Sequence, residues 1–190
     1  MKIMDHYVDI DVRPDPEFPA HQLMSALYAK LHRALAAQAS AGIGVSFPGV
    51  DSKAQHLGTR LRLHGSLVDL STLLAIDWLA GMRDHVALTP PTPTPPAVQH
   101  RRVSRVQVKS SPERLRRRLM RRHTLDEHEA RHRIPDNAIR LAQLPFVQLR
   151  STSTGQSFRL FIEHGPLQPS VLPGTFNAYG LSQQATIPWF

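Results

Sequence analysis

A proline-rich segment near the middle of the chain limits how the whole chain can fold. Residues 89–97 read TPPTPTPPA and contain five prolines. Because proline fixes φ and has no backbone N–H, this segment can form neither a helix nor a central strand. Closely spaced prolines favour an extended, semi-rigid connection instead. We therefore predict a linker over residues 89–98 that joins a first domain, residues 1–88, to a second domain, residues 99–190.

The two sides of this linker differ in charge. Residues 1–100 contain 8 Lys or Arg and 9 Asp or Glu, whereas residues 101–190 contain 15 Lys or Arg and 6 Asp or Glu. A strongly basic half beside a neutral one is typical of proteins in which one part binds a polyanion. The content of 41% hydrophobic and 20% charged residues is that of an ordinary globular protein. We interpret the second half as the part that binds nucleic acid.

The composition also excludes several classes of site. The chain has no cysteine, which rules out disulfides, thiolate catalysis and cysteine-bound zinc, and it has no glycine-rich phosphate loop or H-E-x-x-H motif. His128 and His132, near His123, are spaced i, i+4 and could bind a metal by geometry. Because they lie on a basic, polar helix, a surface role is the better interpretation. We expect no metal and no cofactor. Without a membrane-spanning apolar run or a signal-peptide pattern, we expect a cytoplasmic protein that binds no membrane.

Hydrophobic periodicity predicts an α+β fold for the first domain. Residues 6–12 alternate apolar and polar side chains, which is typical of a half-buried strand. Residues 20–39 carry leucine at every fourth position in their central part, which predicts a helix with one buried face. The next four segments are predicted as strand, strand, helix and strand, over residues 42–47, 59–64, 66–82 and 85–88. The resulting βαββαβ order is the ferredoxin-like pattern.

Leucines define the buried faces of the two predicted helices. In the first helix they are Leu23, Leu27, Leu31 and Leu35, and in the second they are Leu67, Leu70, Leu73 and Leu74. His32 lies roughly 120° from the centre of the first stripe, because successive helical residues are about 100° apart. It is therefore predicted at the border of the buried face.

The second domain is predicted to contain an arginine-rich helix over residues 111–123. Ser110 or Ser111 can cap it, Pro112 suits its first turn, and Glu113 completes an S-x-x-E capping box with Ser110. Five arginines fall within an arc of roughly 140°, namely Arg114, Arg117, Arg118, Arg121 and Arg122. The chain has 19 arginines and 4 lysines, and guanidinium groups bind phosphate in a bidentate way that lysine cannot. Apart from Glu113, four residues before Arg117, this face has no acidic i,i+4 partner within the helix, which favours nucleic-acid binding over a merely solvated helix.

The other elements of the second domain follow from shorter patterns. A strand over residues 101–109 places Arg105 and Gln107 on one face. A short helix is predicted after His123, capped by Thr124 with Glu127 three residues later and ending before Pro135. The remaining predictions are a helix over 136–143, paired strands over 146–150 and 158–163 around the turn STSTGQS, and strand and loop from residue 175 onward.

The available side chains restrict the chemistry. No cluster of carboxylates suggests a nuclease with two metal ions. Phosphodiester cleavage would then use a histidine as general acid or base, with hydroxyl groups as its partners. Cleavage of this kind is natural for RNA, because the 2′-hydroxyl of RNA is itself the nucleophile.

Several motifs, in their order along the chain, resemble the type I-F CRISPR repeat-processing endoribonucleases. They are MDHYVDI and RPDPEFP near the start, KLHRAL in the first helix, SRVQ, the arginine-rich helix, LRSTSTGQSFRLFI and the terminus PWF. The single pieces are weak signals, but the ordered set, from Met4 to Phe190, is highly specific. The resemblance implies a ferredoxin-like N-terminal domain and a second, irregular ferredoxin-related domain that carries the arginine-rich helix.

The resemblance also implies an activity and partners. Such an enzyme binds the stem-loop of a CRISPR repeat RNA and cuts at the 3′ base of the stem. It then stays on the product within an interference complex with other subunits. Given the missing metal motifs, we expect metal-independent attack by the 2′-hydroxyl, which leaves a 2′,3′-cyclic phosphate.

Roles for individual residues follow from the same resemblance. The catalytic residues would be His32, Ser151 and Tyr179. Arg105 and Gln107 would read base edges low in the stem. The other RNA-binding residues would be Phe158 stacked on the terminal base pair, Ser153 near the cut, and the groove-lining side chains of Arg114, Arg117, Arg118, Arg121, Arg122 and His123.

Simpler interpretations stand beside these roles. His32 alone would be a border histidine, Ser151 a turn serine, Tyr179 an anchored core aromatic, and Phe158 a core residue. A non-enzymatic RNA-binding scaffold and a basic DNA-binding module are the alternative functions. The presence of His32, Ser151 and Tyr179 argues against the scaffold. The lack of a recognisable helix-turn-helix argues weakly against the DNA-binding module.

Overall fold

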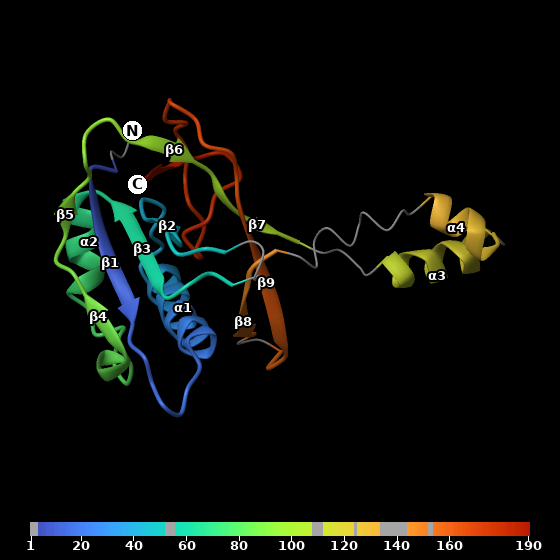
Figure 1. Cartoon of the computed structure of the whole chain (residues 1–190), viewed down its shortest axis with the longest axis horizontal. Coiled ribbons are helices and arrows are strands. Elements are labelled where there is room, and N and C mark those ends of the chain that lie inside the picture. The colour runs from blue at the N-terminus through green and yellow to red at the C-terminus, as the bar shows by residue number, and fades with distance from the viewer. Residues whose placement is uncertain (1–3, 52–55, 108–111, 124, 134–143, 152–153) are drawn as a thin grey trace.

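The main sheet is built from the first half of the chain. The computed structural model describes residues 4–51, 56–107, 112–123, 125–133, 144–151 and 154–190. Its main sheet contains β1 (His6–Val12), β2 (Gly44–Ser46), β3 (Arg60–Gly65) and β4 (Val86–Leu88) in the order β2-β3-β1-β4. Each neighbouring pair in this order is antiparallel. With α1 (Ala20–Ala37) and α2 (Leu67–Leu74), the chain shows the predicted order of strands and helices and an α+β architecture (Figure 1).

The predicted buried stripe of leucines on α1 is confirmed. All four of its leucines are buried, together with Tyr28 and Met24. They pack in one core with Val8, Ile10 and Val12, the alternate residues of β1. His32 is half-buried, as expected for a residue at the border of this face.

The second predicted helix is shorter than expected. α2 begins after Ser66, whose hydroxyl accepts a hydrogen bond from the backbone N–H of Asp69 at 3.1 Å, and it ends at Leu74 instead of residue 82. The chain then turns, and Gly81 adopts a left-handed φ of 72°. This turn buries Trp78 and Met82 in the core, so local packing overrides the helical pattern. Leu70 and Leu73 are buried as predicted, whereas Leu67 is 47% exposed.

The proline-rich segment runs along the edge of the main sheet. Its residues form β5 (Thr92–Pro93), which pairs with the first two residues of β1. The N–H of Thr89 donates to the carbonyl of Asp9 at 3.0 Å, and that of Thr94 donates to the carbonyl of Asp5 at 2.8 Å. An edge position suits prolines because they cannot donate to a further strand. The segment is thus attached to the sheet, while the proposed domain division remains a prediction.

Two small sheets form the second half of the chain. β6 (Gln99–Arg101) pairs with β10 (Ile187–Trp189), and β7 (Val103–Val106), β9 (Ser157–His164) and β8 (Phe146–Arg150) form a sheet in the order β7-β9-β8. The predicted pairing around the turn after residue 150 is confirmed, with Leu149 opposite Phe158. The single strand predicted over 101–109 is divided, because β6 and β7 have different partners. Residues 108 and 109 lie outside the described residues.

The basic segment folds as two helices that lie side by side, α3 (Pro112–His123) and α4 (Glu127–Arg133) (Figure 1). Asp126 caps α4, because its Oδ1 accepts from the N–H of Glu129 at 2.7 Å while Glu129 Oε2 accepts from the N–H of Asp126 at 3.3 Å. The other predicted features, caps at Ser110, Ser111 and Thr124 and a helix over 136–143, lie outside the described residues. No helix in the described part is long and apolar enough to cross a membrane.

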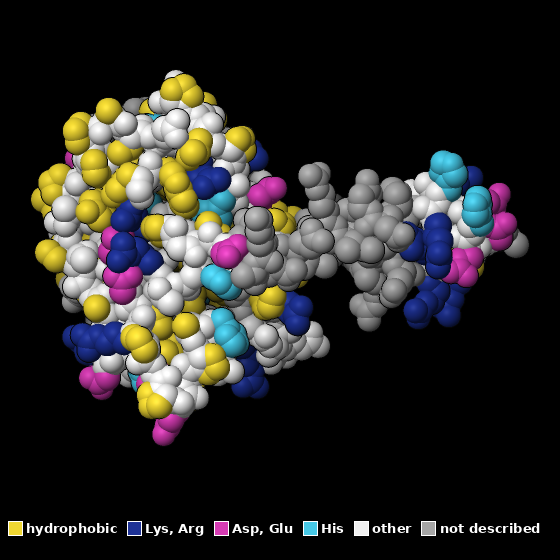
Figure 2. Space-filling model, viewed as in Figure 1, with side chains coloured by type: hydrophobic (Ala, Val, Ile, Leu, Met, Phe, Trp, Pro, Cys, Tyr) yellow, Lys and Arg dark blue, Asp and Glu magenta, His cyan; other side chains and the backbone are white. Residues whose placement is uncertain are grey.

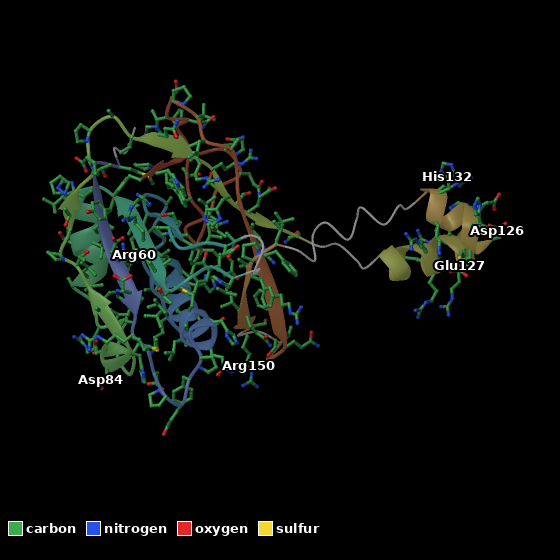
Figure 3. The ribbon with its side chains drawn as sticks, viewed as in Figure 1. Arg60, Asp84, Asp126, Glu127, His132 and Arg150 are labelled. Carbon is green, nitrogen blue, oxygen red and sulfur yellow. The ribbon has the colours of Figure 1, made fainter. Side chains whose placement is uncertain are left out.

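The second face of β1, predicted to be exposed, is buried at Asp9, while Tyr7 and Asp11 on the same face are partly exposed. Asp9 and Arg62 on this face are each only 6% exposed and form a bidentate pair, with N–O distances of 2.6 and 2.9 Å. Arg62 also donates to the main-chain oxygen of Phe190 at 2.8 Å, and its guanidinium lies 4.1 Å from the centre of the Phe190 ring. The end of the chain therefore closes over the polar face of the sheet. On the same sheet, Arg60, labelled in Figure 3, forms a partly exposed pair with Asp11 at 2.7 Å.

A buried histidine accompanies this closure. His64 is completely buried, and its Nε2 lies 2.8 Å from the hydroxyl of Ser46. Burial, with a smaller contribution from the charge of Arg62, lowers the pKa of His64 to about 3. The folded protein therefore holds this ring neutral at pH values where an unfolded chain would protonate it.

We expect the free energy of unfolding to fall as the pH drops below about 6.5, because the unfolded chain then binds a proton at His64 that the folded chain does not. The contribution of His64 should approach about 1.4 kcal/mol per pH unit between its folded pKa of about 3 and the ordinary value of 6.5. Urea unfolding at several pH values should show a weaker pH dependence for His64→Gln. The control His128→Gln changes an exposed ring on α4 and should keep the wild-type slope. An unchanged slope in His64→Gln would contradict the assignment.

Candidate active site

A cavity of about 370 Å³ lies where the two halves of the chain meet. Five of the predicted site residues line it, His32, Arg105, Ser151, Phe158 and Tyr179. α1 supplies the histidine, while the sheet β7-β9-β8 and the segment before β10 supply the others. A hydrogen bond from the N–H of Gln148 on β8 to the hydroxyl of Ser25 on α1, 3.1 Å long, holds this sheet against the helix.

His32 has a defined orientation in this cavity. Its Nδ1 lies 2.9 Å from the carbonyl oxygen of Ala178. A carbonyl can only accept, so Nδ1 carries the hydrogen, and Nε2 of the neutral ring keeps its lone pair. The ring also stacks on Tyr179, with centroids 3.9 Å apart and planes within 7°. The predicted catalytic residues His32 and Tyr179 thus contact each other by stacking their rings. The hydrogen bond that orients the imidazole is made to a main-chain carbonyl instead. This arrangement suits a general base.

A tight turn presents Ala178 and Tyr179 to α1. The side-chain oxygen of Asn177 accepts from the N–H groups of Tyr179 at 2.8 Å and Leu181 at 3.2 Å. Gly180 adopts a left-handed φ of 68°, and a Cβ there would lie 2.6 Å from a methyl group of Val45. Both features require glycine at this position. The sequence N-x-x-G contains the residues typical of such a turn, so a turn search would have found a role for Asn177 that our sequence analysis missed.

A buried tyrosine holds the same turn from inside. The hydroxyl of Tyr28 donates to the carbonyl oxygen of Tyr179 at 2.6 Å. Burial raises the pKa of Tyr28 well above its ordinary value, so this hydroxyl stays protonated and remains a donor. Nothing in the sequence separates Tyr28 from an ordinary aromatic residue of the helix core.

Ser151 lies at the start of the turn that joins β8 to β9. Its N–H donates to the carbonyl of Gln156 and its carbonyl accepts from the N–H of Gly155, both at 2.9 Å. Its hydroxyl oxygen accepts from the N–H of Thr154 at 3.2 Å. These bonds fix Ser151 in the turn where it lines the cavity. Ser153, in the same turn, lies outside the described residues.

The predicted base-reading residues have different surroundings. The guanidinium of Arg105 lies 6.0 Å from the ring centre of Phe158 and 5.8 Å from that of Tyr179, so it extends into the cavity. Phe158 is half-buried. Gln107 follows the end of β7, is exposed, and does not line the cavity. Arg150, which the sequence analysis had not singled out, lies at the end of β8 (Figure 3), lines the cavity and donates to the carbonyl of Gly155 at 2.9 Å.

The arginine-rich helix does not line this cavity. The side chains of Arg117, Arg118, Arg121, Arg122 and His123 are exposed, and Figure 2 shows Lys and Arg gathered where α3 lies. Within the described residues, these four arginines form no ion pair. Arg116 is largely buried, and the side chain of Arg114 lies outside the description. The exposed arginines form a basic surface separate from the cavity.

Among the described residues, no group of three or more His, Asp or Glu side chains is placed to hold a metal ion. This includes the helix that carries His128 and His132.

The chain resembles known proteins over nearly its whole length. Residues 7–190 match the family model described as CRISPR-associated protein (Cas_Csy4). The chain belongs to the Csy4 family. A protein of Pseudomonas aeruginosa (strain UCBPP-PA14), named CRISPR-associated endonuclease Cas6/Csy4, is 60% identical over 187 residues. A protein of the same name from Escherichia coli (strain UTI89 / UPEC) is 49% identical over 187 residues, and both alignments cover 98% of this chain and 100% of the relative. The region of this chain that matches the Csy4 family model, residues 7–190, includes every predicted site residue.

We expect Asn177→Ala to destabilise this Csy4-family protein by about 0.5–1.5 kcal/mol, because the backbone N–H groups of Tyr179 and Leu181 each lose an acceptor at a partly exposed turn. Asn177→Asp keeps an acceptor oxygen and should retain most of the stability. Urea unfolding of the two variants and the wild type measures the difference. In the wild type, ¹⁵N chemical shifts should show that neutral His32 is protonated on Nδ1, and Asn177→Ala should weaken this preference. Equal stability of the Ala and Asp variants would exclude the side-chain oxygen as the support of the turn.

Proposed function

We propose that this Csy4-family chain is an endoribonuclease that binds the stem-loop of a CRISPR repeat RNA and cuts it at the 3′ base of the stem. The observation that carries the proposal is the orientation of His32, whose Nδ1–H is bound to Ala178 while the cavity also holds Ser151, Tyr179 and Arg105. The names of the two relatives, which include the word endonuclease, support it.

In the proposed reaction His32 is the general base. Its Nε2 takes the proton of the 2′-hydroxyl on the nucleotide upstream of the cut, and the 2′-oxygen forms a bond to phosphorus as the bond from phosphorus to the 5′-oxygen breaks. The 5′-oxygen takes a proton from solvent, so the products are a 2′,3′-cyclic phosphate and a 5′-hydroxyl. Ser151 hydrogen-bonds the attacking hydroxyl or the phosphate, and Tyr179 keeps the imidazole plane in place. Because the nucleophile belongs to the RNA, this route needs no metal ion.

The RNA stem would be bound by the second half of the chain. Arg105 and Gln107 have the groups for bidentate contacts to guanine and adenine edges, and they would read the foot of the stem. Phe158 would stack on the terminal base pair. Ser153 would lie near the cut. The residues that line the groove of the RNA stem would be Arg114, Arg117, Arg118, Arg121, Arg122 and His123.

We further propose a ferredoxin-like first domain and a second, irregular ferredoxin-related domain. The sheet order β2-β3-β1-β4 and the alternation of strands and helices support the first assignment. In this arrangement the first domain supplies His32 and the second holds the RNA. After cleavage, the protein would remain on the product and join other subunits of an interference complex.

Replacing Arg117 and Arg118 together by Ala should weaken RNA binding and flatten its salt dependence. Each lost phosphate contact reduces the slope of log K against log[salt] by about 0.7–0.9. Binding isotherms at several salt concentrations measure this slope. The control is Arg83→Ala, which removes an exposed arginine from the first half of the chain and should leave the slope unchanged. An unaltered slope in the double variant would remove α3 from the RNA-binding surface.

His32→Ala should reduce the cleavage rate about 10²–10⁴-fold, because a positioned general base is worth that much. Affinity for the repeat RNA should stay near that of the wild type. A single 2′-deoxy nucleotide upstream of the cut should block cleavage by the wild type in the same way, and wild-type cleavage should proceed in EDTA with a 2′,3′-cyclic phosphate as product. Cleavage of the deoxy substrate, or an absolute need for Mg²⁺, would disprove the mechanism.

A further inference from the structure

Three arginines line the cavity around His32, and they differ in their bonding. Arg150 donates through Nε to the carbonyl of Gly155, and the guanidinium of Arg105 lies over the rings of Phe158 and Tyr179. The side chain of Arg33 is exposed and has no hydrogen bond, ion pair or ring contact within the described residues. Its charge is therefore the least engaged of the three.

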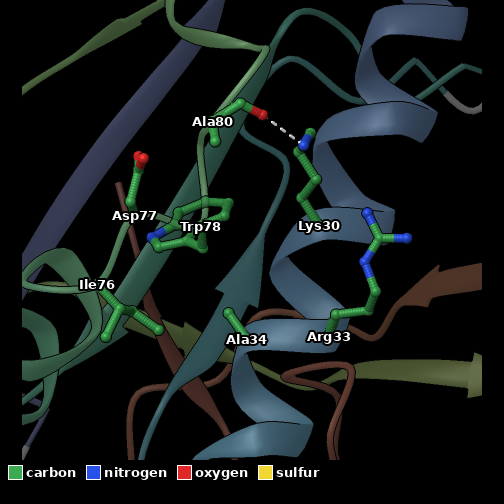
Figure 4. A pocket seen from close by; sticks show the side chains of 7 residues that line it. All are labelled: Lys30, Arg33, Ala34, Ile76, Asp77, Trp78 and Ala80. Carbon is green, nitrogen blue, oxygen red and sulfur yellow. Dashed lines mark hydrogen bonds between the residues drawn. The ribbon is translucent and has the colours of Figure 1, made fainter.

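The position of Arg33 on α1 links it to the cavity of His32. It follows His32 directly in the helix and lines the same cavity. It also lines a second cavity of about 370 Å³, together with Lys30, Asp77 and Trp78 (Figure 4). Arg33 thus stands at the edge shared by the two cavities, where RNA in the first would reach its guanidinium.

The neighbouring charges of the second cavity are already bound to the protein. The amino group of Lys30 donates to the carbonyl of Ala80 at 2.6 Å, and the carboxylate of Asp77 accepts from Arg83 at 2.6 Å. In the view of Figure 4, Asp77 and Arg33 lie on opposite sides of Trp78. No carboxylate in the described part of the chain neutralises Arg33, so the guanidinium is available to an anion.

We propose that Arg33 is a further catalytic residue, whose guanidinium binds the non-bridging oxygens of the phosphate that is cut. The inference rests on the proposed endoribonuclease function. When the 2′-oxygen attacks, negative charge increases on these oxygens, and a preformed donor at that place stabilises the transition state more than the ground state. The planar fork of arginine matches two phosphate oxygens. Arg33 neither gains nor loses a proton, and His32 remains the base.

This role divides the chemistry between two neighbouring residues of one helix. Side chains at successive helical positions point about 100° apart, so His32 and Arg33 can approach a bound phosphodiester from different directions. His32 would face the 2′-hydroxyl, and Arg33 would face the phosphate oxygens. The backbone of α1 keeps the spacing between them constant.

The test is single-turnover cleavage of the repeat RNA at saturating protein. Arg33→Ala should reduce the rate constant roughly 10²–10³-fold, as expected for loss of one oxyanion donor. Arg33→Lys should recover part of the rate, because it keeps the charge but not the fork. The matched control is Lys30→Ala, which removes a cation one turn earlier on α1 that does not line the His32 cavity. Its rate constant should stay within roughly threefold of the wild type.

Affinity separates a catalytic role from simple binding. The dissociation constant of the uncleavable 2′-deoxy RNA should change less than roughly threefold in Arg33→Ala. A large loss of this affinity with a normal rate at saturation would make Arg33 a binding residue and overturn the inference. A normal rate with normal affinity would overturn it as well. Failure of the wild type to cleave, or wild-type cleavage of the deoxy RNA, would instead refute the proposed function.

Discussion

The arrangement of the candidate site depends on how one turn near the end of the chain docks onto the first helix and the main sheet. Three hydrogen bonds make this contact: His32 Nδ1–H to the carbonyl of Ala178, the Tyr28 hydroxyl to the carbonyl of Tyr179, and the N–H of Val45 to the carbonyl of Gly180. The last is 2.9 Å long and comes from the main sheet. Because the carbonyls belong to three successive residues, a shift of the turn would disturb all three bonds together. The orientation of His32 is therefore coupled to the packing of the two halves.

The same end of the chain also covers part of the polar face of the main sheet. Arg62 holds the main-chain oxygen and ring of Phe190 while it pairs with Asp9 on the neighbouring strand. A buried charge pair is costly unless its remaining donors are satisfied, and the bond to Phe190 satisfies one of them. The buried arginine thus has a structural role, whereas Arg33 and four arginines of α3 are exposed and form no ion pair within the described residues.

Sequence patterns predicted the parts of the fold that depend on local periodicity. The alternation of β1, the leucine stripe of α1, the hairpin β8–β9 and the border position of His32 were all confirmed, because burial of one face imposes a period of 2 or 3.6 on the side chains. The pattern failed over residues 75–82, where Trp78 and Met82 are buried by a turn instead of a helix. It also missed the burial of Asp9 on the polar face of β1, where Arg62 and Phe190 cover the carboxylate. Both failures involve contacts that no local pattern records.

The sequence by itself determined which residues can do chemistry and what charge surrounds them. The absence of cysteine, the arginine-rich segment and the ordered motifs with His32, Ser151 and Tyr179 are all properties of the chain as written. Only the tertiary structure decided how these residues meet, since residues more than 100 positions apart come together through packing. It supplied the carbonyl of Ala178 as the partner of His32, the supports Tyr28 and Asn177, and the cavity that His32 and Arg33 both line. A sequence does not show which main-chain carbonyl a side chain will bind, or which charged side chain will lack a partner. Both depend on which groups the rest of the folded chain covers and which it leaves exposed.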